Sequence, residues 1–363
     1  MLENGKIPPH QYTIMIAFFI VGGSILYTPS GLVHSAKQDA WMANIIVVGL
    51  GLLLVSLFNL LGSRFPTMNL TEYSEKILGK WLGKFVSFLY FIYFFLSLAV
   101  FIRQIGDFVI IQILPDTPIL PLHILLIAIM IMGVRYGIET FSRAIEIFFP
   151  IIFLLLLIFI ISIFPMIQFQ QLQPILANGI KPVISAALKS IGTPYLQLVL
   201  FLMFFPAVNQ TTKAKKSFLL GTIIGGNVLT IVTLLSILCL GTYFSENMQF
   251  VTYALALKIN IGGFWQRIEA VMAFIWFISI YIKITIYFYG SIICLGQILE
   301  LKEYKCLTFP LGLITLILSL IINKNIVESD KQAEWWTSFS LPFGLFFPLL
   351  LLIVSKIRKK GRY

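Results

Sequence analysis

Ten apolar segments run along this chain, and each is long enough to cross a lipid bilayer as a helix. Such a helix needs about 20 apolar residues, because the hydrocarbon core is about 30 Å thick and each residue rises about 1.5 Å. Only 11% of the 363 residues are charged, and this low share excludes an ordinary soluble protein. The sequence therefore predicts an all-α integral membrane protein with ten transmembrane helices. The predicted spans are approximately 12–34, 42–62, 84–112, 118–134, 143–165, 192–209, 217–243, 266–298, 307–323 and 337–355.

The ten predicted spans divide into two halves of five. Because an odd number of crossings reverses the side from which the next span enters, we expect a five-plus-five inverted repeat. We expect one transmembrane, permease-like domain over residues 1–363, with the first repeat at approximately 10–165 and the second at approximately 183–356. The two halves share no sequence identity that could support the repeat, so it rests on the order of the spans.

The distribution of basic residues favours cytoplasmic positions for both termini. With that orientation most lysines and arginines lie in inner loops, for example at 213–216 and at 356–358. A basic chain can also bind nucleic acid, but here the basic residues are scattered along loops, so we expect no nucleic-acid partner. Residues 1–10 are polar and the apolar run that follows is too long for a cleavable signal peptide.

Two of the predicted spans carry helix-breaking residues. The first span is interrupted by Gly22-Gly23-Ser24 and then by Pro29, and the sixth by Phe204-Phe205-Pro206. Adjacent glycines and proline both disfavour a continuous helix. Irregular backbone is tolerated inside a membrane only where protein or a water-lined cavity satisfies its polar groups. Interruptions at corresponding positions of two halves therefore predict a small-molecule site near the middle of the membrane, with helices 1 and 6 broken.

Both interruptions supply candidate ligand-binding groups. The exposed N–H groups at the start of the second half-helix suit a carboxylate, and carbonyls freed before Pro206 suit an ammonium group. Two simpler interpretations stay open: the glycine pair allows close helix contact, and Pro206 only bends a helix. The candidate binding residues are Gly22, Gly23, Ser24, Tyr27, Thr28, Met203, Phe204, Phe205 and Pro206.

Three charged residues fall inside the predicted spans. Lys283 lies about 25 Å from either end of its helix, too far to reach water easily, and an ionisable residue at that depth is usually functional. We interpret it as a proton carrier, as a fixed charge in place of a coupling cation, or as a structural tether to carbonyls of the first span. Arg103 and Asp107 lie four residues apart on one helix face, either as a self-neutralising pair or as a gate near the exterior mouth.

The remaining patterns point away from an enzyme. The chain contains no phosphate-binding loop, zinc-protease motif or nucleophile elbow, and its cysteines and histidines lack the spacing of metal ligands. We expect no cofactor and no metal ion. Three short surface helices are also expected, within 66–84, within 168–190 with an apolar face of Ile184, Leu188 and Ile191, and at 250–259.

Several motifs resemble the spore-germination permease-like family of the amino acid–polyamine–organocation transporter superfamily. The similar stretches are 22–29, 37–41, 204–209, 267–270 and 276–283, and their order and spacing cover essentially the whole chain. The resemblance implies the LeuT-like five-plus-five fold, with an amino acid bound between broken helices 1 and 6. In related transporters the first break commonly reads Gly-x-Gly, and here Ser24 takes the place of the second glycine.

The resemblance also implies a sensor. Members of this family are the B subunits of nutrient germinant receptors, and act in the spore inner membrane with an A-type subunit and a C-type lipoprotein subunit. We therefore expect a receptor subunit that binds a small germinant, such as an amino acid, and triggers germination. A proton-coupled or uncoupled amino-acid permease, and a structural subunit without a ligand, are the alternatives.

Overall fold

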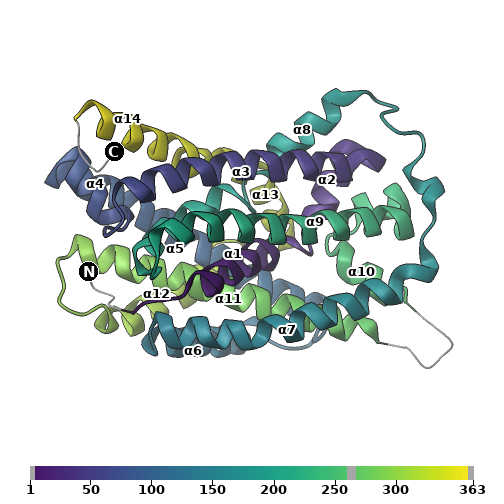
Figure 1. Cartoon of the computed structure of the whole chain (residues 1–363). Helices are drawn as coiled ribbons and strands as arrows, with labels where there is room; N and C mark the ends of the chain where they lie inside the picture. The colour runs from purple at the N-terminus through teal and green to yellow at the C-terminus, as the bar shows by residue number, and fades with distance from the viewer. Residues whose placement is uncertain (1–4, 260–266, 359–363) are drawn as a thin grey trace.

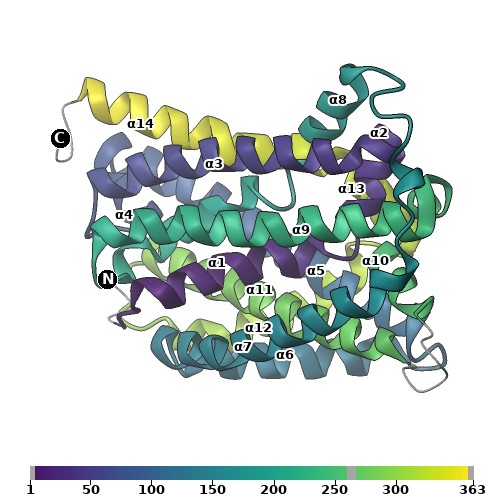
Figure 2. The same ribbon diagram turned by 45° about the vertical axis from the view of Figure 1, so that its right-hand side comes forward.

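The computed structural model describes residues 5–259 and 267–358, and these residues form a helical bundle. In this part of the chain there is no β-strand, only a parallel bridge between Ile7 and Val208. Figure 1 shows the long helices lying side by side, with both chain ends at one end of the bundle. We refer to this end as the terminal end, and to the end that carries α8 and α10 as the opposite end (Figure 2).

The first half of the chain supplies helices on both sides of the bundle centre. Its elements are α1 (Pro9–Ser24), α2 (Thr28–Ala36), η1 (Lys37–Asp39), α3 (Ala40–Arg64), α4 (Leu70–Leu78), α5 (Lys80–Gln112), α6 (Ile119–Arg135), α7 (Ile138–Ile163), η2 (Phe164–Met166) and η3 (Phe169–Leu172).

The second half begins on the surface and then crosses the bundle repeatedly. Its elements are α8 (Ile180–Ser190), η4 (Leu196–Met203), η5 (Phe205–Ala207), α9 (Thr211–Asn247), α10 (Val251–Leu257), α11 (Ile268–Ile298), η6 (Lys305–Leu307), α12 (Thr308–Ile321), α13 (Ile326–Leu341), the π-helical turn η7 (Pro342–Phe346) and α14 (Phe347–Ile357).

Six helical segments of the described residues are long and apolar enough to cross a membrane: Thr28–Arg64, Lys80–Gln112, Ile138–Met166, Thr212–Asn247, Ile268–Ile298 and Ile326–Ile357. Two further apolar helices, Ile119–Arg135 and Lys305–Ile321, are shorter. Residue 266, where one span is predicted to start, lies outside the described residues. The ten-span count and the inverted repeat stay predictions.

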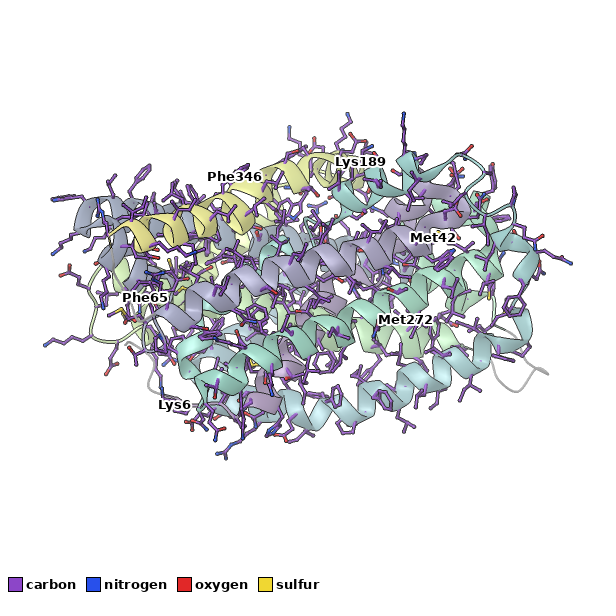
Figure 3. The ribbon with its side chains drawn as sticks, turned by 45° about the horizontal axis from the view of Figure 1, so that its top comes forward. Lys6, Met42, Phe65, Lys189, Met272 and Phe346 are labelled. Atoms are coloured by element: carbon purple, nitrogen blue, oxygen red, sulfur yellow. The ribbon has the colours of Figure 1, made fainter. Side chains whose placement is uncertain are left out.

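The bundle centre is formed by α1, α5 and α11, while apolar side chains on the outside face the surroundings. In α11 most residues between Ile268 and Gly296 are buried. On outer helices, large apolar side chains such as Ile161 and Phe346 are 69% and 59% exposed. Figure 3 shows Phe346 projecting from the outer face of the bundle. Exposed apolar side chains on the outer helices are expected of a protein surrounded by lipid tails, since no water there penalises apolar surface.

One of the predicted surface helices is shorter than expected. The helix expected within 66–84 ends at Leu78, because Gly79 adopts φ +96° and starts the long helix α5 at Lys80. Its start is set by a capping box, in which the Asn69 side chain accepts from the Glu72 N–H and Glu72 accepts from the Asn69 N–H, both at 3.1 Å.

The short helix expected within 168–190 is present as α8. Its Ile184 and Leu188 are 44% and 55% exposed, while Val183, Ala186 and Ala187 are buried. The apolar face of Ile184 and Leu188 therefore points away from the protein core. The helix expected at 250–259 is present as α10.

Candidate functional site

The predicted interruption of the first span is present. Helix α1 ends at Ser24 and α2 begins at Thr28, so that Ile25, Leu26 and Tyr27 connect them. The turn is held by two backbone hydrogen bonds, from the Ile25 N–H to the Val21 carbonyl at 2.9 Å and from the Tyr27 N–H to the Ser24 carbonyl at 3.2 Å. The backbone is thus irregular at this point, but local hydrogen bonds hold it in place.

The sixth predicted span is also irregular. Residues 196–203 and 205–207 wind as 3₁₀-helices, η4 and η5, instead of an α-helix. The expectation that the Phe204 carbonyl is freed before Pro206 is wrong, because it accepts a 2.9 Å hydrogen bond from the Ala207 N–H. The tighter helix thus supplies an i to i+3 partner where an α-helix would have lost one.

The N-terminal segment pairs with this second interruption. The Ile7 N–H donates to the Ala207 carbonyl at 2.9 Å, and the Asn209 N–H donates to the Ile7 carbonyl at 3.0 Å. The Lys6 ammonium donates to the Pro206 carbonyl at 3.0 Å. The terminal end of the bundle is therefore closed at this position by backbone contacts between residues far apart in the sequence.

The two glycines of the first interruption have different neighbours. A Cβ added at Gly22 would collide with the backbone carbonyl of Ser279 on α11, so this glycine permits close contact of α1 with α11. A Cβ at Gly23 would lie 2.5 Å from Nζ of Lys283 and 2.9 Å from the Phe101 ring. Gly22 thus has the packing role left open above, and Gly23 faces the buried lysine.

Lys283 is fully buried and lies among aromatic rings. Its Nζ atom is 4.5 Å from the ring centroid of Phe19 on α1 and 4.3 Å from that of Phe101 on α5. Within the described residues, Nζ has no hydrogen-bond partner, so the predicted tether to carbonyls of the first span is not formed. The Nζ atom instead lies over the faces of two aromatic rings.

Ser24 is a second buried polar group without a partner at this place. It is 0% exposed, and its Oγ atom makes no hydrogen bond in the part of the chain that the structure describes. Buried hydroxyls are nearly always satisfied in folded proteins, so an orphan beside a helix break needs an explanation.

Helix α10 covers the interruption from the opposite end of the bundle. The Thr252 hydroxyl donates a 2.6 Å hydrogen bond to the Ile25 carbonyl, which the break leaves without a helical partner. The Tyr27 ring packs edge-on against Phe250 with 5.3 Å between centroids, and Phe250 lies 5.1 Å from Phe108. The aromatic rings of Phe250 and Phe108 therefore lie over Tyr27 and the neighbouring Thr28.

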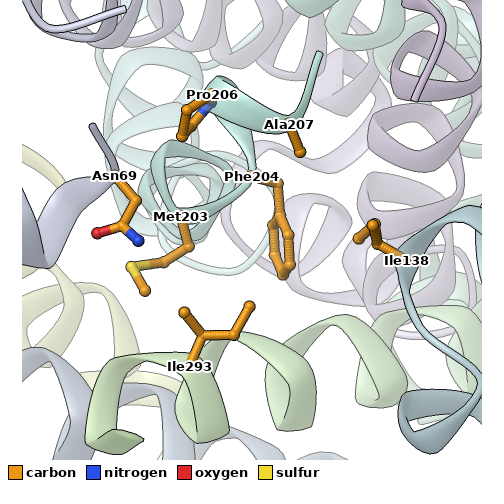
Figure 4. A pocket seen from close by; sticks show the side chains of 7 residues that line it. All are labelled: Asn69, Ile138, Met203, Phe204, Pro206, Ala207 and Ile293. Atoms are coloured by element: carbon orange, nitrogen blue, oxygen red, sulfur yellow. The ribbon is translucent and has the colours of Figure 1, made fainter. Parts of the chain in front are cut away.

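Met203, Phe204 and Pro206 line a different space. Together with Asn69, Ile138, Ala207 and Ile293 they surround a cavity of about 20 Å³ (Figure 4), which has room for about one water molecule. Ile293 follows Lys283 by ten residues on α11, a rise of about 15 Å. Phe205 points elsewhere, since its ring lies 3.0 Å from a Cβ added at Gly62. The structure thus places the two predicted residue groups at different levels of the bundle.

Arg103 and Asp107 form a buried ion pair. Nε of Arg103 donates to Oδ1 of Asp107 at 2.8 Å, and its Nη2 donates to the Lys324 carbonyl at 3.3 Å. The Ser329 hydroxyl lies 3.4 Å from the other carboxylate oxygen. The self-neutralising arrangement predicted from the spacing is present, and it connects α5 to the start of α13.

A larger, polar cavity of about 340 Å³ lies at the terminal end between α4 and the end of α11. It is lined by Thr71, Glu72, Glu75, Gln297, Glu300, Leu301 and Lys302. Glu300 accepts from Lys84 at 2.7 Å and from Lys80 at 3.1 Å, and these ammonium groups lower the pKa of its carboxyl to about 2. Burial raises the pKa of the Glu75 carboxyl above its ordinary value.

Sequence reasoning missed several residues that form the surroundings of the first interruption: Phe19, Phe101, Thr252 and Ser279. Phe19 precedes Gly23 by four residues and could have been found from helical spacing. The others come from three different helices, so only the packing of the bundle brings them to α1. Among the described residues, no three His, Cys, Asp or Glu side chains are grouped as metal ligands.

Comparisons with known sequences match this chain to a protein family and to individual relatives. Residues 6–327 match the family described as spore germination protein. The chain is 31% identical to spore germination protein KB of Bacillus subtilis (strain 168), over 99% of this chain and 97% of that protein. It is 24% identical to spore germination protein YndE of the same organism, over 99% and 98% of the two chains.

A solved structure supports the fold in particular. A manganese transporter of Eremococcus coleocola, in complex with an aromatic bis-isothiourea substituted compound, aligns with a TM-score of 0.56. The alignment covers 97% of this chain and 81% of the transporter, at 14% sequence identity. At this level of identity the similarity concerns the fold alone.

Proposed function

Because this chain belongs to the spore germination protein family, we propose that it is the membrane subunit of a nutrient germinant receptor. In this role it binds a small germinant, such as an amino acid, at the interruption between α1 and α2 and thereby triggers germination. The chain is a multi-pass membrane protein with spore-germination relatives, and this context favours a receptor over a free-standing carrier. The role is one of binding and signalling, without a chemical reaction.

The proposal includes a membrane arrangement. The helices cross the spore inner membrane ten times as two inverted five-span repeats, within one domain whose termini are both cytoplasmic. The terminal end of the bundle then faces the cytoplasm, and α8 and α10 face the exterior. Support comes from the excess of basic residues in the loops at the terminal end. The partners are the A-type and C-type receptor subunits and the surrounding lipid.

The position of the proposed site rests on one observation. Near the end of α1, Nζ of Lys283 and the hydroxyl of Ser24 are fully buried, and neither has a hydrogen-bond partner among the described residues. Unpaired polar groups inside a membrane protein are costly and tend to mark ligand pathways. Their location beside a broken helix supports a ligand that would satisfy them.

Deletion and complementation of the gene test the proposal. Spores that lack the chain should lose germination in response to at least one nutrient, measured by loss of optical density with single amino acids and single sugars. Complementation with the unaltered chain should restore that response, as should the Gly49→Ala variant, whose added Cβ meets no atom within 4 Å. A deletion strain with an unchanged response to every nutrient would contradict the receptor role.

An amino-acid permease is the second candidate. The similarity in fold to a solved metal-ion transporter favours it, because such folds move small solutes. Purified chain in lipid vesicles should then accumulate radiolabelled amino acid above empty vesicles. A receptor subunit that only binds its germinant should show saturable binding without accumulation.

A further inference from the structure

The outer face of α9 carries a polar side chain at a depth where lipid tails surround the protein. The inner face of this helix packs on α1, since a Cβ added at Gly221 or Gly225 would lie 2.6 Å and 2.9 Å from α1 atoms, respectively. On the opposite side of the helix, Asn227 is exposed. Figure 2 shows α9 and α3 side by side on the near face of the bundle.

Asn227 lies far from both ends of the apolar part of α9. The nearest charged residues on this helix are Lys216, eleven residues before it, and Glu246, nineteen residues after it. These separations correspond to about 16 and 28 Å along the helix axis, and a hydrocarbon core is about 30 Å thick. The short side chain of asparagine therefore does not reach water on either side.

The amide of Asn227 also lacks a partner inside the protein. Thr230, one turn further along α9, is paired with the Asn44 side chain at 2.9 Å and with the Gly226 carbonyl at 3.0 Å. Within the described residues, the Asn227 amide forms no such hydrogen bond. Lipid tails offer no hydrogen-bonding groups, so an amide at this depth remains costly until another protein group pairs with it.

The side chains around Asn227 are suited to packing against a further helix. Asn227 shares one side of α9 with four exposed apolar residues at helical spacing, and we call these five residues the α9 outer face: Leu220, Ile223, Ile224, Asn227 and Ile231. Between transmembrane helices, an asparagine within an apolar face forms hydrogen bonds across the contact. The amide then sets the depth at which the two helices meet.

The requirement for a hydrogen-bonding group at mid-membrane determines what can cover this face. It excludes lipid tails and any partner that stays in water. An asparagine amide both donates and accepts hydrogen bonds, so it is complementary to a second asparagine amide. A two-fold axis along the membrane normal places the same residue of two copies at the same depth, and two-fold contacts are the commonest in homo-oligomers. A second copy of the chain therefore meets the requirement.

We propose that the α9 outer face is a homodimer interface, in which the Asn227 amides of two copies pair across a two-fold axis along the membrane normal. The partner is thus a second copy of this chain. This inference concerns assembly within the membrane, and it holds whichever solute the chain binds.

The strength of association between copies tests this inference. Donor and acceptor dyes are attached to the exposed Cys306 in a Cys239→Ser background, and energy transfer is measured in lipid vesicles over a range of protein-to-lipid ratios. Asn227→Leu should raise the dimer dissociation constant by about tenfold or more, because the amide pair is lost. Asn227→Gln keeps an amide and should retain most of the association. Ser338→Leu, which replaces an exposed polar side chain on α13, is the matched control and should leave it unchanged.

The melting temperature separates a lost contact from a misfolded chain. Leucine is favoured over asparagine within a helix, and it removes an amide from the lipid-facing surface. Asn227→Leu should therefore melt no lower than the unaltered chain at protein-to-lipid ratios where both are monomeric.

Cysteine cross-linking locates the contact. In a chain whose Cys239 and Cys306 are replaced by serine, Ile223→Cys and Ile231→Cys should each cross-link to the same position of a second copy when oxidised in the membrane. These positions flank Asn227 by one turn on either side. Ile129→Cys on α6, which is also exposed on the outside of the bundle, should remain uncross-linked.

Three results would overturn the inference: the unaltered chain stays monomeric at the highest protein-to-lipid ratio, Asn227→Leu associates as strongly as the unaltered chain, or Ile129→Cys cross-links better than both α9 positions. A chain that is monomeric alone but binds a different membrane protein through Asn227 belongs to the first result, because the face then serves another partner.

Discussion

The hydroxyl of Thr252 donates a 2.6 Å hydrogen bond to the backbone carbonyl of Ile25, and this bond fixes α10 over the break between α1 and α2. Both residues are fully buried. The bond supplies a partner for a carbonyl that the interrupted helix would leave unpaired, which is costly inside a membrane protein. Movement of α10 away from the bundle must therefore break this bond.

Replacing Thr252 by valine should loosen the packing of α10 over the break between α1 and α2. The change keeps the shape of the side chain but leaves the Ile25 carbonyl without a donor, at a cost of about 1–3 kcal/mol. Amide hydrogen exchange in residues 251–257 should accelerate by about tenfold or more, measured by mass spectrometry. Thr252→Ser keeps the hydroxyl and should behave like the unaltered chain. Equal exchange in both variants would show that the bond does not hold α10.

Gly22→Ala should destabilise the contact between α1 and α11. The new methyl group would meet the carbonyl of Ser279, which belongs to a helix backbone and cannot rotate away. Overpacking of this kind costs about 1–3 kcal/mol, and it should lower the melting temperature in nanodiscs. Gly49→Ala on α3 is the control, because its Cβ meets nothing within 4 Å, and alanine favours a helix over glycine. A Gly22→Ala protein as stable as the Gly49→Ala protein would reject the close contact.

Removing one partner of the pair Arg103–Asp107 should cost more stability than removing both. Asp107→Leu leaves the Arg103 guanidinium buried without a counter-charge, a loss of about 3–5 kcal/mol. The double variant Arg103→Met with Asp107→Leu should recover most of that loss, because no unpaired charge is left. Melting temperatures of the single and double variants give the coupling. Additive losses would mean that the two side chains do not stabilise each other.

Low pH should weaken the contact of Glu300 with Lys84 and Lys80. The pKa of the Glu300 carboxyl is lowered from 4.5 to about 2 by these lysines, so its contribution is fully present above pH 4.5 and is lost as the pH falls toward 2. The melting temperature of the unaltered chain should therefore decline over this range, and Glu300→Gln should decline less. Glu303→Gln, on the same loop, should follow the unaltered chain. Parallel curves for all three proteins would show that the ion pairs add no stability.

The helices could be predicted from the sequence, because an apolar run of sufficient length is a local property of the chain. The two interruptions were predictable for the same reason, since glycine and proline change the backbone where they occur. The ion pair of Arg103 with Asp107 also followed from spacing on one helix. Each of these features depends on residues that are close together in the sequence.

The candidate site could be predicted only in part, because its surroundings depend on how separate helices meet. Lys283 was recognisable from its depth, but its aromatic neighbours Phe19 and Phe101 belong to α1 and α5. The direction of the apolar face of α8 could not be predicted from the sequence, because near a membrane a face such as that of Ile184 and Leu188 can point to lipid as well as to protein.

The pairing of Ile7 with residues 207–209 connects the beginning of the chain directly to the second interruption. Whatever pulls on the residues around Lys6, such as an attached tag, trimming by a protease or capture by another protein, pulls on the same bonds that hold Pro206 in place. A perturbation at the amino end is thus transmitted directly into the bundle interior, without passing through any long helix.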